Sequence, residues 1–242
     1  MNKYYIGSYW VDRVQTLAEC LVDIENFLIN LEKCLGKIKS LKFVSAHGEK
    51  IIVLSDFSTK KSELSKILLN PDLNYYYKND SSDILDSYSS VGCVSMWQVE
   101  FVESQSIRIT ICNGGEINNS AVIYFEKEHL TKLDKEGKLP AVWETCILSF
   151  HPEHAYIMSN ELFRKLDPDF VLNTIIGWWS YFNDSNKIIV DTNDFKITKF
   201  CAGVEIKILK TDIGTLDSKA LTKFDKALNS LIKSGFVHEY GF

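Results

Sequence analysis

The stretch VSMWQVEFVESQSIRITICNGG, residues 94–115, decides the fold class of this 242-residue chain. From Ile107 to Ile111 isoleucines alternate with Arg108 and Thr110, the period-two pattern of a strand that has one wet face. The closing Asn-Gly-Gly is a turn sequence. The pattern predicts an antiparallel meander with strands over 94–103, 106–112 and 121–125.

An amphipathic helix precedes this block. Thr16-x-x-Glu19 matches a capping box near its start, and Gly36 ends it. A helix that faces the core is the simplest interpretation, and a coiled-coil seam for a partner is the alternative. Its apolar stripe, with alternating spacings of three and four residues, is Val14, Leu17, Leu21, Ile24, Leu28, Leu31 and Leu35.

The rest of the chain mixes strands and helices without regular alternation, which predicts an α+β fold with a mainly antiparallel sheet and several packed amphipathic helices. We expect a single domain over 1–242, and a division within the polar segment 71–90 is the alternative. Short strands are expected at 41–54, 155–158, 175–182 and 204–208, and helices at 62–69, 126–135, 140–148, 160–166 and from Asp217 to Gly235.

Composition narrows the classes of partner. The formal net charge is −5, and only three of the 27 basic residues are arginines. Because phosphate recognition favours arginine, this balance argues against nucleic-acid binding and favours a basic protein partner. Six scattered cysteines without metal-ligand spacing indicate reduced, mostly buried thiols. The sequence offers neither an export signal nor a membrane span, so we expect a cytoplasmic protein without membrane contact.

Motifs that carry chemistry are sparse. His151-Pro152-Glu153-His154 joins two imidazoles and a carboxylate, but its spacing differs from the i, i+4 histidines of a zinc helix. We find neither a phosphate-binding glycine loop nor a nucleophile elbow. We therefore predict no catalytic, cofactor-binding or metal-binding residue. The alternative is an enzyme that uses these histidines or a cysteine.

Two aromatic motifs carry a family resemblance. The opening YIGSYWVDR at 5–13, followed by TLAEC at 16–20, resembles the start of the immunity protein 52 family of bacterial polymorphic toxin systems. The later GWWSYF at 177–182 is similar to the second signature of that family. The chain departs from the family at 42–45, where KFVS stands in place of a strand that tends to carry Trp or Tyr.

The resemblance implies a single α+β domain that has no catalytic activity and binds a cognate protein toxin encoded nearby. Toxins paired with this family are often predicted nucleases of the restriction-endonuclease type, delivered by contact-dependent or type VI secretion. Such a partner would make the chain a cytoplasmic immunity protein in bacterial competition, with neither a nucleic acid nor a membrane as its partner.

An acidic inhibitor can compete with nucleic acid for the basic groove of a nuclease, through a few carboxylates around an aromatic anchor. The aromatic motif residues, among them Trp10, Arg13 and Trp178, are assigned to the fold instead. The residues expected to bind the toxin are Tyr75, Tyr76, Asp80, Asp83, Asp86, Glu100, Glu103 and Glu116.

Overall fold

The computed structural model divides the chain into two compact units. Unit 1 comprises Met1–Ser8, Phe125–Glu136 and Pro152–Phe242, and unit 2 comprises Tyr9–Tyr124 and Gly137–His151. The polar segment 71–90 falls inside unit 2. The structure describes residues 3–11, 13–45, 48–68, 77–78, 84–86, 88–89, 92–103, 106–116, 119–169, 176–183, 195–209, 212–235 and 237.

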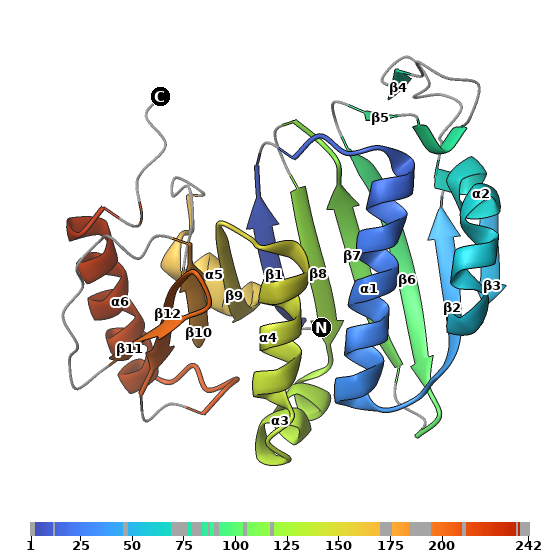
Figure 1. Ribbon diagram of the computed structural model, residues 1–242. Helices are drawn as coiled ribbons and strands as arrows, with labels where there is room; N and C mark the ends of the chain where they lie inside the picture. The colour runs from blue at the N-terminus through green and yellow to red at the C-terminus, as the bar shows by residue number, and fades with distance from the viewer. Residues whose placement is uncertain are drawn as a thin grey trace. The chain divides into compact units, whose positions relative to one another are not determined.

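Unit 2 contains the predicted meander, and the strands expected at 41–54 form a hairpin that extends it into one run of antiparallel strands (Figure 1). Side chains along β6 alternate between buried and exposed over most of its length, so each strand presents one face to the core. The strand order is β8 (Asn119–Phe125), β7 (Ser106–Asn113), β6 (Cys93–Phe101), β2 (Ile38–Ser45) and β3 (Gly48–Ile52).

The first helix, α1 (Leu17–Leu35), forms with the predicted capping box. The Glu19 N–H donates to the Thr16 hydroxyl at 3.3 Å, and the Thr16 N–H donates to the Glu19 carboxylate at 2.8 Å. The apolar stripe is buried from Leu17 onward, whereas Val14 lies before the helix and is exposed. The stripe therefore packs into the core and is not available as a coiled-coil seam.

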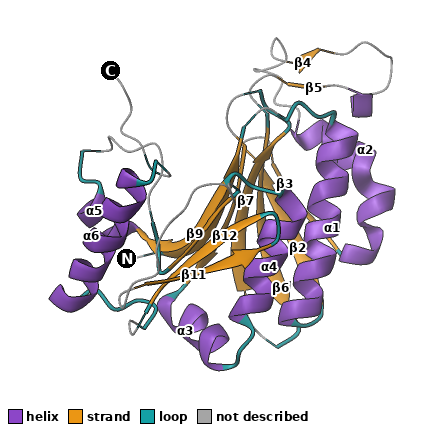
Figure 2. Cartoon of the chain, turned by 60° about the vertical axis from the view of Figure 1, so that its left-hand side comes forward, coloured by secondary structure: helices purple, strands orange, loops and turns teal. Residues whose placement is uncertain are grey.

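Helices α1, α2 (Phe57–Leu68) and α4 (Leu139–Phe150) lie on one face of the unit 2 strands (Figures 1 and 2). Aromatic rings fill the space between the two layers. Trp97 on β6 lies 4.8 Å from Phe43 and 5.6 Å from Phe57, measured between ring centroids. Because buried Phe57 anchors its first turn, α2 begins earlier than predicted, directly after the 3-10 turn η1 (Leu54–Asp56).

Unit 1 combines strands with three helices among its described residues: α3 (Lys127–Lys135), α5 (Asn160–Leu166) and α6 (Ser218–Lys233). These helices confirm the predictions, and Asp217 caps α6 as expected. Strand β11 was not predicted, and β10 is shorter than the expected strand. The order is β11 (Phe195–Phe200), β12 (Gly203–Ile208), β10 (Trp179–Phe182), β9 (His154–Ser159) and β1 (Tyr4–Trp10), whose last two residues belong to unit 2.

The aromatic motif residues serve packing, as predicted. In unit 1, Trp178 lies 6.0 Å from Tyr4 and meets Phe224 of α6 edge-on at 5.8 Å. A side chain at Gly177 would collide with a backbone carbonyl of β9, so the close strand approach there requires glycine. In unit 2, Trp10 stacks on a phenylalanine of α4.

The remaining described elements of unit 2 are short: β4 (Tyr77–Lys78), η3 (Ile84–Asp86) and β5 (Tyr88–Ser89). The α+β class with mainly antiparallel strands and packed helices is confirmed. None of the helices within the described ranges combines the length and apolarity needed to cross a membrane.

Candidate protein-interaction surface

The histidines of the 151–154 segment occupy different environments. His151 is exposed and closes α4 in the left-handed conformation, with a φ of 45°. Burial lowers the pKa of His154 to about 4, because the charged imidazole is poorly solvated there. His154 is therefore neutral at physiological pH. Across the described ranges, no three His, Cys, Asp or Glu side chains gather closely enough to hold a metal ion.

Most of the cysteine thiols are withdrawn from solvent. A hydrogen bond with Cys93, together with burial, raises the pKa of the Cys20 thiol far above its ordinary value. Burial raises the pKa of Cys112 to about 11. Cys201 is the exception to the predicted burial, because it lies exposed in the turn between β11 and β12 with a φ of 50°.

The structure separates the described members of the expected toxin-binding carboxylates, which lie in unit 2 at the two ends of β7 and in η3. Glu100 ends β6 and accepts a hydrogen bond from the Ser40 hydroxyl at 2.9 Å, and exposed Glu103 lies in the turn that follows. Glu116 lies in the turn at the other end of β7, also exposed. Asp86 is exposed in η3, which packs against α1 and α2. Tyr75, Tyr76, Asp80 and Asp83 lie outside the described residues.

Two further carboxylates, Glu19 and Asp23, lie at the Glu116 end. Neither was predicted from the sequence to belong to a binding surface. The Gln15 N–H donates to the Gly114 carbonyl at 3.4 Å, which joins the start of α1 to the turn between β7 and β8. Glu19 is therefore near this turn, and the Gln15 side chain also holds Asp23 through a 2.8 Å hydrogen bond. The capping box located Glu19 on the helix but gave no signal for the neighbouring turn.

The face of the unit 2 strands opposite the helices, which we call the open face, is unusually apolar. Val94 is 57% exposed, Met96 is 39% exposed and Ile51 on β3 is 68% exposed. Met96 pairs with Val44 on one side and with Thr110 on the other, so the apolar side chains are continuous across β2 and β6. A bare antiparallel face normally carries polar side chains, so this apolar content marks a candidate contact surface.

Charged and aromatic side chains border this apolar centre. The Arg108 guanidinium lies over the Tyr124 ring at 4.5 Å, and these residues pair directly across β7 and β8. Lys42 forms an ion pair with Glu49 at 2.6 Å. An apolar centre with methionine, tyrosine and arginine nearby has the composition of a protein interface.

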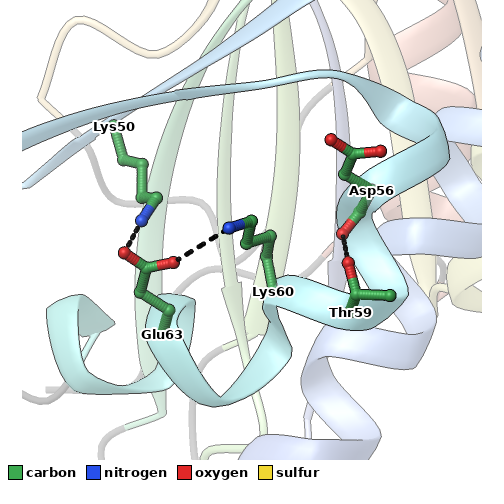
Figure 3. Close-up of polar contacts among 5 residues, drawn as sticks. All are labelled: Lys50, Asp56, Thr59, Lys60 and Glu63. Carbon is green, nitrogen blue, oxygen red and sulfur yellow. Dashed lines mark hydrogen bonds and ion pairs between the residues drawn. The ribbon is translucent and has the colours of Figure 1, made fainter.

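A charged side chain protects the edge strand β3 from pairing with a further strand. Lys50 points to the helix-covered side, where it forms an ion pair with Glu63 of α2 (Figure 3). Lys60 also approaches Glu63, at 3.7 Å (Figure 3). An inward-pointing charge discourages another strand from adding to a sheet edge. The open face, rather than this edge, is therefore the better candidate for partner contact.

Comparison with solved structures reveals a likeness of fold. No protein-family model matches the chain, and no curated protein matches it. Among solved structures, the fold is similar to that of the Pseudomonas aeruginosa T6SS protein PA0821, with a TM-score of 0.51 and 10% sequence identity. The match covers 95% of this chain and 76% of that chain. Membership of the immunity protein 52 family remains a prediction.

Proposed function

We propose that the chain is a cytoplasmic immunity protein that binds a cognate secreted toxin and neutralises it stoichiometrically. The observation that carries the proposal is the fold likeness to a protein of the type VI secretion system over nearly the whole chain. Such systems deliver toxins between bacteria, and the aromatic motifs of this chain independently resemble an immunity family. A likeness of fold alone does not fix a function, so the surface must supply the physical argument.

The surface of unit 2 supports binding. The open face offers exposed Val94 and Met96, and the Glu116 end offers carboxylates. An apolar centre with separate charged regions suits protein contact, because burial of apolar side chains supplies affinity and charges supply specificity and association rate.

The proposal assigns the chain no chemistry of its own. Cys20 and Cys112 have raised pKa values, so neither thiol supplies a thiolate nucleophile at neutral pH. The neutral, largely buried His154 belongs to the packing of β9 beside Tyr156, at a ring distance of 6.2 Å. Inhibition then follows from occlusion of the toxin, and the amount of inhibitor must match the amount of toxin.

Electrostatics would assist the encounter if the toxin is a nuclease. A nuclease presents a basic groove to phosphates, and the net charge of −5 on this chain attracts such a surface within about a Debye length, beyond which salt screens the attraction. This attraction raises the association rate at low ionic strength and weakens with added salt.

Co-expression with the product of the adjacent gene tests the proposal. We expect the toxin alone to kill the host, the pair to restore growth, and the two chains to elute together as a one-to-one complex on a sizing column. A toxic neighbour that this chain neither binds nor neutralises would contradict the proposal.

A further inference from the structure

We infer that the open face of unit 2 is the surface that anchors the toxin, with Arg108 meeting a carboxylate of that partner. The inference rests on the proposed function and names the contact surface within it. It differs from the expectation drawn from sequence, which gave the contact to carboxylates of this chain.

Leaving the apolar side chains of this face exposed to water costs free energy. Val94 and Met96 on β6 expose large apolar side chains, and so does Ile51 on β3, which is separated from β6 by β2, although polar side chains are usual on an open antiparallel face. On β7, the outward-facing positions Ser106, Arg108 and Thr110 are polar. Contiguous exposed apolar surface of this kind favours association, because covering it removes apolar area from water.

The charged side chains on the open face differ in how they are paired. Lys42 is neutralised by Glu49, and Glu100 accepts a hydrogen bond from Ser40. Arg108 is exposed, and among the described residues no carboxylate pairs with it. The guanidinium lies over the Tyr124 ring, and a contact with a ring face uses none of the guanidinium N–H groups as hydrogen-bond donors to oxygen.

These features define the chemistry of the partner. An apolar side chain of the toxin would cover Met96, and a toxin carboxylate would meet Arg108, which lies over Tyr124 and pairs with no carboxylate among the described residues. The carboxylates at the Glu116 end lie around the turn between β7 and β8, at the ends of the strands. They contribute to long-range attraction and less to the energy of the final contact.

The experiment measures the dissociation constant of the complex between this chain and the adjacent-gene product, made inactive by mutation. Met96→Asp and Arg108→Glu change the open face at exposed positions, and Glu116→Lys is the matched control at the other group of charges. We expect each open-face variant to weaken binding at least about 30-fold and the control to weaken it less than about threefold. Melting temperatures of all variants should stay close to that of the wild type.

The outcomes separate the inference from the proposed function. Wild-type affinity in both folded open-face variants, with a large loss in Glu116→Lys, would overturn the open-face inference and leave the immunity function standing. No binding by the wild-type chain would overturn both. If Met96→Asp proves unstable, Arg108→Glu alone decides, since a side chain stacked on the surface is not required for folding.

Discussion

The two faces of the unit 2 strands are formed by alternating residues of the same strands. One face packs against the helices, and the other is exposed. On β6, Trp97 is 1% exposed beneath the helices, while its neighbour Met96 is 39% exposed on the open face. Both side chains are large and apolar, so hydrophobicity does not distinguish them. A strand can therefore place apolar side chains in the core at alternate positions and expose others between them.

The largest expected effect is on the covered face. Replacement Trp97→Ala leaves a cavity between Phe43 and Phe57 and should destabilise the protein by about 3–5 kcal/mol. Met96→Ala, on the open face, should change stability by less than about 0.5 kcal/mol. Urea unfolding of the two variants measures both values. Similar losses would show that the open face is also part of the folded core.

The next comparison concerns acid pH, where protonation of His154 in unit 1 should lower the stability of the protein. Its folded pKa of about 4 lies below the ordinary value of 6.5, so the unfolded chain binds the proton more tightly. The contribution to stability is complete above pH 6.5 and is lost as pH falls toward 4, by up to about 3 kcal/mol. Urea unfolding of wild type and His154→Gln across this range should give curves that converge at low pH. Curves that stay parallel would place His154 in contact with solvent.

Thiol accessibility offers a third comparison. A pKa of about 11 for Cys112 leaves a thiolate fraction at pH 8 about a hundredfold below that of an ordinary cysteine. A thiol-reactive reagent added to the native protein should therefore modify exposed Cys201 first. Cys201→Ser provides the control, since it should remove the fast phase. A fast phase that persists in this variant would contradict the burial described here.

The smallest effect concerns how α1 is fixed over the covered face. Loss of the capping hydroxyl in Thr16→Ala should cost about 1 kcal/mol, because the Glu19 N–H loses its acceptor. Thr131 bonds back to the Lys127 carbonyl within α3, so Thr131→Ala removes a hydroxyl without removing a cap. We expect its unfolding free energy to match that of the wild type. Equal losses in both variants would count against the capping box.

Much of the fold could be predicted because its signals are local. The capping box, the glycine stops and the alternation along β7 each depend on a few neighbouring residues. Which face of β6 points to the core is harder to predict, because Val94 and Met96 on one face are apolar, like Trp97 and Val99 on the other. The structure buries Ser95, whose hydroxyl donates to the Ile111 carbonyl at 3.4 Å, in order to bury the larger set.

The candidate surface depends on contacts far apart in sequence, so the sequence did not show which carboxylates lie at the same end of the strands. Glu100 ends β6 and Glu116 follows the adjacent strand β7, so the antiparallel pairing places the two carboxylates at opposite ends of these strands. Glu19 reaches the Glu116 end only because α1 packs its first turn beside Gly114. No short sequence pattern encodes such a meeting.

A titration of toxin activity with this chain tests the central claim most directly. If the chain is a stoichiometric inhibitor, residual activity should fall linearly and end near zero at one equivalent, with a salt-sensitive association rate. Complete inactivation by a small fraction of an equivalent would indicate catalysis by this chain. Activity that is unchanged at several equivalents would exclude it as the immunity protein of that toxin.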